Sequence, residues 1–146
     1  MGKLYLVRHG QASFGAADYD NLSALGHRQS VRLGEYFVSE GTHFDAVMTG
    51  PLKRHAQTYA GIAQGAGMEQ QPTLWPGLNE FDAEAVIAAI HPGPLPPPTT
   101  PASYKLHFRL LRDGLTQWMN GVLTPKGMPS YDAFVEGVTS ALDHVR

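Results

Sequence analysis

Cysteine is absent from this chain of 146 residues, and its absence removes several kinds of chemistry at once. Without thiols there is no disulfide framework, no cysteine nucleophile and no zinc site built on cysteine. Long apolar runs are missing too, since no stretch approaches the roughly 20 residues needed to cross a bilayer. Residues 1–7 reach Arg8 before the apolar region of a signal peptide could form. We therefore expect a cytoplasmic protein with no membrane partner.

The chain also has no excess of basic residues, since it contains 11 Lys and Arg against 13 Asp and Glu and has a formal net charge of -2. A nucleic-acid partner is not expected, since that function needs clustered cations. No two of the seven histidines lie within four residues of each other, so no local His-x-x-x-His motif predicts a metal site. The chain also has no Walker loop, dinucleotide fingerprint or nucleophilic serine elbow, and we expect no cofactor.

The tripeptide Arg8-His9-Gly10 follows the apolar run Leu4–Val7, which predicts a short buried strand. Such a strand delivers the arginine and the histidine to its carboxyl end, where ligands bind in open α/β sheets. Gly10 lets the backbone turn sharply and approach a ligand closely. An imidazole beside a fixed cation suits attack on a phosphoryl group. The alternative is a strand that simply ends in solvated polar residues.

Predicted strands and helices alternate along the chain. We expect strands at Leu4–Val7, Phe44–Thr49 and Gln71–Trp75, and helices after an N-cap at Ser23, from Pro51 to Gly65, and over Ala83–Ile90, Leu106–Met119 and Tyr131–Val145. Alternation of this kind predicts βαβ units with a parallel sheet, and the length predicts a single domain over residues 1–146. Residues 91–101 hold six of the eleven prolines and predict a stiff surface loop or lid, with a proline-rich partner ligand as the alternative.

Each predicted strand leads into a polar group at the same edge of the sheet. The first is followed by Arg8 and His9, the second by a segment that places Arg54 in the first helical turn, and the third by Glu80. Two guanidiniums and a positive helix end can hold one phosphate. His9 would supply a nucleophile, and Glu80 a proton donor. The set is chemically sufficient for the first step of phosphoryl transfer.

Four blocks, in order, carry a resemblance to a known family: Leu6–Gln11 (LVRHGQ), Leu22–Gln29 (LSALGHRQ), Thr49–Thr58 (TGPLKRHAQT) and Leu78–Asp82 (LNEFD). The first closely resembles the signature of the histidine phosphatase superfamily, which includes cofactor-dependent phosphoglycerate mutases. The second is similar to a helix start of that family, the third to the block with its second phosphate arginine, and the fourth to the block with its acidic proton donor. The resemblance implies a three-layer α/β/α fold with a mostly parallel sheet.

The resemblance also implies roles for individual residues. His9 would be the nucleophile that becomes phosphohistidine, Arg8 and Arg54 would clamp the phosphoryl oxygens, and Glu80 would protonate the leaving oxygen and then activate water. Three further residues are candidates for contacts with phosphate or substrate: Gln11, Ser13 and Asn21. The implied function is hydrolysis of a small phosphomonoester, with a phosphoglycerate mutase type of transfer as the alternative.

One departure from the family pattern is as important as the match. The family uses a second histidine in a later Ser-His-Gly turn, and no His-Gly follows Gly10 in this chain. His144 falls inside the predicted terminal helix, where a solvated role is expected. A truncated protein or a degenerate homologue would each give this pattern, and a non-catalytic module that binds anions or a partner stays open as a function.

A parallel sheet of three strands would leave its edges exposed. We therefore expect residues 1–146 to be the N-terminal part of a longer family fold. The isolated chain should be marginally stable or associate through a strand edge, and a homo-oligomer is left open.

Overall fold

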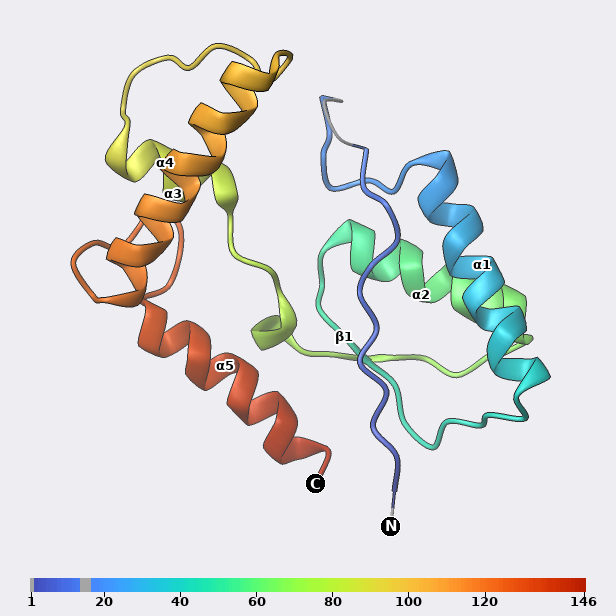
Figure 1. Ribbon diagram of the computed structural model, residues 1–146. Helices are drawn as coiled ribbons and strands as arrows, with labels where there is room; N and C mark the ends of the chain where they lie inside the picture. Colours follow the sequence, from blue (N-terminus) through green and yellow to red (C-terminus); the bar gives the residue numbers. More distant parts are fainter. Residues whose placement is uncertain (1, 14–16) are drawn as a thin grey trace. The chain divides into compact units, whose positions relative to one another are not determined.

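Two helices and a short parallel sheet make up the first of two units, Met1–Asn79 and Glu80–Arg146, into which the chain divides. The computed structural model describes residues 2–13 and 17–146 (Figure 1). The elements of the first unit are α1 (Ala24–Ser39), β1 (Met48–Thr49), α2 (Lys53–Ala66), β2 (Thr73–Leu74) and the 3-10 turn η1 (Pro76–Leu78).

The sheet consists of β1 and β2 in parallel, with Met48 opposite Thr73 and Thr49 opposite Leu74. The Thr73 N–H donates to Val47 O at 2.9 Å, and the Trp75 N–H donates to Thr49 O at 2.8 Å. The expected parallel pairing of the second and third strands is therefore confirmed, although each strand is shorter than predicted.

The predicted strand Leu4–Val7 is wrong. Within the described residues β1 and β2 are the only multi-residue strands, and Leu4–Val7 is exposed chain, with Leu6 82% exposed (Figure 1). Its anchor is Tyr5, whose ring makes edge contacts with Phe37 at 5.7 Å and Phe44 at 5.4 Å between centroids. Apolar, strand-favouring residues become a strand only when a neighbouring strand pairs with them.

Helices α1 and α2 pack through small residues. A Cβ on Gly34 would lie 2.1 Å from Ile62 O, and a Cβ on Gly65 would lie 2.1 Å from Val31 O. The buried residues of α1 are Gly26, Ser30, Gly34 and Phe37. Phe37 is 5% exposed, whereas Leu25 is 41% exposed. Backbones that approach this closely leave no room for large side chains between them.

Local signals place the helix ends well. Ser23 Oγ accepts the Gly26 N–H at 3.1 Å, which confirms the predicted N-cap of α1. Helix α2 starts at Lys53 rather than at Pro51, because Leu52 takes the extended N-cap conformation. It runs through Gly65 and ends at Gly67, whose φ of 64° is the left-handed conformation that glycine favours.

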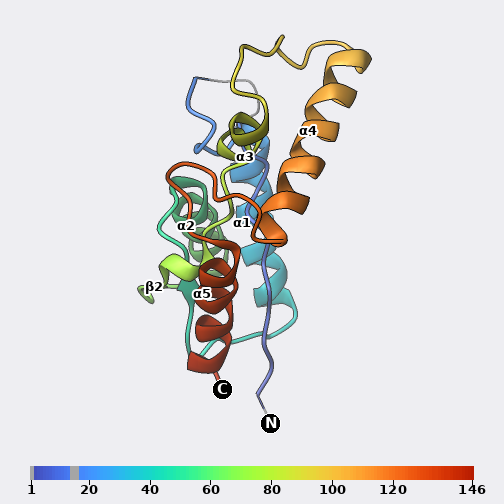
Figure 2. The ribbon, with the colours of Figure 1, turned by 90° about the vertical axis from the view of Figure 1, so that its left-hand side faces the viewer.

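The second unit is helical, with α3 (Ala83–Ile90), α4 (Pro101–Met119) and α5 (Tyr131–His144). Trp118 is its buried centre, and the indole contacts the rings of Phe81, Tyr131 and Phe134. The predicted α3 is confirmed at both ends, whereas α4 begins at Pro101 instead of Leu106. Residues 91–100 form the expected loop, which joins α3 to α4 (Figure 2).

The α/β class is confirmed by the parallel β1–β2 pair and the five helices. The three-layer arrangement is not confirmed, because Leu4–Val7, the first of the three expected strands, is not part of the sheet of the described residues. Over the described part of the sequence, every helix is too short or too polar to cross a membrane.

Candidate functional site

His9 is held by its own loop. The ring Nδ1 lies 2.7 Å from the carbonyl oxygen of Gly10. A carbonyl oxygen only accepts, so Nδ1 carries the hydrogen and Nε2 carries the lone pair of the neutral ring. Fixing the tautomer in this way leaves Nε2 as the ring nitrogen without a hydrogen in the neutral form of His9.

Gly10 anchors this loop to both helices of the first unit. Its N–H donates to Thr58 Oγ1 at 3.0 Å, and the Thr58 hydroxyl donates to the carbonyl oxygen of Arg54 at 2.7 Å. A Cβ on Gly10 would lie 2.5 Å from Gly26 O. Glycine is therefore needed at position 10 because the backbone there passes close to α1. This contact explains the glycine without the close approach to a ligand that the sequence predicts.

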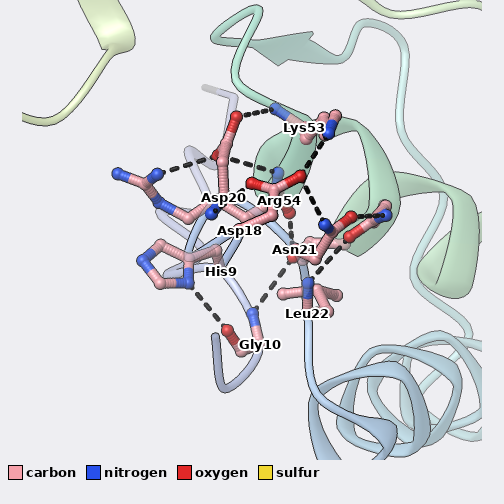
Figure 3. Close-up of polar contacts among 10 residues, drawn as sticks. His9, Gly10, Asp18, Asp20, Asn21, Leu22, Lys53 and Arg54 are labelled. Carbon is pink, nitrogen blue, oxygen red and sulfur yellow. Dashed lines mark hydrogen bonds and ion pairs between the residues drawn. The ribbon is translucent and has the colours of Figure 1, made fainter. Parts of the chain in front are cut away.

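Arg54 is the second residue of α2, and its side chain is only 8% exposed. Its Nη1 donates to Asp20 Oδ1 at 2.8 Å. Asp20 also accepts the backbone N–H of Lys53 at 2.9 Å and that of Arg54 at 3.3 Å, so it caps a helix whose own N-cap, Leu52, has no side-chain hydrogen bond (Figure 3). One distant carboxylate thus fixes both the start of α2 and the buried guanidinium.

The charge of Asp20 is stabilised by these contacts. Burial alone would raise the pKa of its carboxyl, but hydrogen bonds from the Lys53 and Arg54 backbones and from the Arg54 guanidinium outweigh burial and hold the pKa below its usual range. Asp18 is exposed and pairs with the Lys53 ammonium, which lowers the pKa of that carboxyl as well. The guanidinium carbon of Arg54 lies over the Tyr19 ring, 5.5 Å from the ring centroid.

A second imidazole lies beside His9. The rings of His9 and His55 are 6.0 Å apart between centroids and tilted by 36°. His55 is not among the site residues that the sequence predicts. The signal that could have indicated His55 is its position directly after Arg54, in the first turn of α2.

Three other predicted site residues hold the first unit together. Gln11 Oε1 accepts the Ser23 hydroxyl at 2.7 Å, Asn21 Oδ1 accepts from Gln57 Nε2 at 3.0 Å, and the Ser13 N–H donates to Asn21 O at 2.8 Å. Residues 14–16, which follow Ser13, lie outside the described residues.

The remaining predicted residues are placed differently. Arg8 is exposed next to His9 in the chain. Glu80 is the first residue of the second unit, whereas His9, Arg54 and Asp20 belong to the first. His144 is the exposed last residue of α5, in agreement with its predicted helical position.

The first unit contains groups whose chemistry suits an oxyanion. The neutral form of the His9 imidazole has a lone-pair nitrogen, and the buried guanidinium of Arg54 is a forked hydrogen-bond donor. Among residues 2–13 and 17–146, no three His, Cys, Asp or Glu side chains gather in a way that could hold a metal ion.

Comparisons with known proteins match the first part of this chain. The family model of the histidine phosphatase superfamily (branch 1) matches residues 4–87. A relative from Saccharomyces cerevisiae, the broad-specificity phosphatase YOR283W, is 33% identical over 85 residues, which are 53% of this chain and 37% of the yeast protein. No solved structure matches the chain. Because the family model covers more than half of the sequence and includes His9 and Arg54, this chain belongs to the histidine phosphatase superfamily.

Proposed function

We propose that this protein hydrolyses small phosphomonoesters through a phosphohistidine formed on His9. The observation that carries the proposal is the hydrogen bond of 2.7 Å from His9 Nδ1 to Gly10 O, which leaves Nε2 as the nucleophile. The superfamily assignment and the phosphatase name of the yeast relative support the same reaction class.

In the first step, the lone pair of His9 Nε2 attacks phosphorus, a P–N bond forms and the ester P–O bond breaks. The guanidiniums of Arg54 and Arg8 pair with the phosphoryl oxygens and neutralise charge that builds up during transfer. Glu80, as its carboxylic acid, gives its proton to the leaving oxygen. The burial of Arg54 supports its part, since a guanidinium held in place loses little entropy on binding.

In the second step, water attacks the phosphohistidine. The carboxylate of Glu80 takes a proton from that water, the P–N bond breaks and inorganic phosphate leaves, which returns the lone pair to His9. Glu80 follows Asn79 directly in the chain, and a Cβ on Gly50 would lie 2.6 Å from Asn79 Oδ1. Chain connectivity therefore favours Glu80 for this role. Gln11, Ser13 and Asn21 are secondary candidates for substrate contacts.

Two alternatives make different use of the same residues. A mutase would return the phosphoryl group to another hydroxyl of the product instead of to water. A non-catalytic module would bind an anion or partner without forming phosphohistidine.

The decisive experiment incubates the chain with an aryl phosphate and measures both phosphate release and acid-labile phosphohistidine by mass spectrometry. We expect both signals for the natural chain, neither for His9→Ala, and both for the control His27→Ala, which changes an exposed histidine of α1. Phosphate release that survives His9→Ala would contradict the mechanism. Anion binding without phosphohistidine would support the non-catalytic module.

A further inference from the structure

We propose that a groove between α1 and α2 docks an acidic amphipathic helix of a partner protein. The groove, named the α1–α2 groove, is lined by residues of α1 in the range 27–32 and by residues of α2 in the range 57–64. It lies within the first unit, and neither His9 nor Arg54 lines it. A partner bound there therefore does not depend on the proposed phosphatase reaction.

The shape of the α1–α2 groove suits one helix. The two helices come close through small residues, since a Cβ on Gly61 would lie 2.5 Å from Ser30 Cβ. Gly61 is buried and, together with Val31 and Ala60, forms a low and mostly apolar floor. The groove has a volume of about 410 Å³ and extends over about two turns of α2. A third helix packs on a pair of helices through side chains that enter a groove of this kind.

The floor of the groove favours an apolar side chain. Val31 is half-buried and Ala60 is exposed, so both present apolar surface to solvent. The amide of Gln57 is already engaged, because its Oε1 accepts the Leu22 N–H at 2.8 Å and its Nε2 donates to Asn21 Oδ1 at 3.0 Å. Covering the floor with an apolar side chain removes this surface from water, which is favourable.

The rim of the groove is cationic. Arg28 and Arg32 line it, are exposed and lie four positions apart, which is about one turn on the same face of α1. Glu35 is the only carboxylate in the sequences of α1 and α2, and it pairs with Arg32 at 2.5 Å. In the part of the chain that the structure describes, Arg28 has no carboxylate partner. Since like charges at this spacing repel each other, the rim favours an anionic partner.

Floor and rim together define the partner. Carboxylates one turn apart on a helix have the same spacing as the two guanidiniums, and each guanidinium can bind one carboxylate. An apolar side chain between these carboxylates, on the same face, would meet the floor. A small anion would pair with Arg28 and Arg32 but leave Val31 and Ala60 in water. The occupant is therefore a helix with an apolar residue between two carboxylates.

The test uses a defined helix as the probe. A capped alanine-based peptide of about 15 residues, long enough to be partly helical in water, carries two glutamates four positions apart and a leucine between them on the same face. It is titrated into the isotope-labelled full chain, and the backbone NMR signals of Val31, Ala60 and Gly61 are followed. One control peptide has lysine in place of glutamate, and another has serine in place of leucine. Arg28→Gln removes one rim charge, and Arg109→Gln, which changes an exposed arginine of the second unit, is the matched control.

We expect the acidic peptide to cause saturable shifts of these signals. Arg28→Gln should raise its dissociation constant by about threefold to fivefold, as loss of one exposed ion pair does, and Arg109→Gln should leave it unchanged. The affinity should fall in about 0.5 M NaCl, because salt screens exposed charges. The lysine and serine peptides should each bind at least about threefold more weakly than the acidic peptide.

The absence of saturable shifts up to about 5 mM acidic peptide overturns the proposal, since a specific site of this chemistry would bind at that concentration. Equal affinity for the lysine peptide, or for Arg28→Gln and the natural chain, overturns the recognition of charge. Equal affinity for the serine peptide, or the same shifts with inorganic phosphate, replaces the helix by a simple anion as the occupant. All these outcomes are read from signals of the groove, so they are distinguishable from a failure of the proposed phosphatase reaction.

Discussion

The carboxylate of Asp20 lies 2.8 Å from Nη1 of Arg54 and also accepts the first two N–H groups of the helix that carries this arginine. A residue from the segment before α1 thus acts as the N-cap of α2 and as the partner of a buried cation. Any anion that binds Arg54 meets a guanidinium whose orientation is already set by this contact.

Asp20→Asn should lower the free energy of unfolding by about 1 kcal/mol, in the range found for loss of a helix cap. The amide cannot match the carboxylate as an acceptor for two N–H groups and a guanidinium. Urea unfolding followed by circular dichroism measures the change. Asp18→Asn, which alters an exposed carboxylate on the same segment, is the control and should change stability little. Equal effects of the two variants would contradict a capping role for Asp20.

The stability contributed by Asp20 should depend on pH in one direction. Its pKa in the folded protein is below the ordinary value, so the contribution is complete above the unfolded pKa of about 3.9 and is lost as the pH falls through the folded pKa. Between pH 6 and a pH near 2, the natural chain should therefore lose more stability than Asp20→Asn. If the free energy of unfolding of both proteins fell by the same amount over this pH range, the carboxylate of Asp20 would have no such role.

Gly34→Ala should destabilise the first unit by about 1–3 kcal/mol, the usual cost of overpacking. Its methyl group would lie 2.1 Å from the backbone oxygen of Ile62, which cannot move without shifting α2. Thermal unfolding provides the measurement. Gly2→Ala is the control, because no atom lies within 4 Å of the added carbon there. A Gly34→Ala protein as stable as the control would show that the two helices can separate at little cost.

The exposed segment Leu4–Val7 should cause association of the chain at high concentration, because extended apolar segments with free backbone groups pair with other chains. Leu6→Lys should shift sedimentation toward the monomer, since a lysine at this exposed position opposes pairing between copies. Val122→Lys, which changes another exposed apolar residue, in the second unit, should leave association unchanged. A natural chain that stays monomeric up to millimolar concentration would refute this prediction.

Glu80→Gln should slow hydrolysis of alkyl phosphates much more than that of aryl phosphates, because good leaving groups need little protonation. Values of kcat/KM for one substrate of each kind provide the comparison. Equal losses on both substrates would contradict the acid role of Glu80 and would leave His9 as the nucleophile.

The sequence by itself determined the features that depend on neighbouring residues. The N-cap at Ser23, the bounds of α3 and the start of α5 at Tyr131 followed from capping side chains and helical periodicity, which act within one or two turns. The motif around His9 and Arg54 was also readable, since residue types in a fixed order define the family.

Only the tertiary structure decided which of these residues meet. Leu4–Val7 has the composition of a buried strand, but its state depends on a partner strand that local sequence does not specify. The core face of α1 depends on glycines that let two backbones touch, and the contacts of Asp20 with Arg54 and of His55 with His9 join residues more than 30 positions apart. Long-range contacts of this kind arise from the packing of whole helices, which no local pattern encodes.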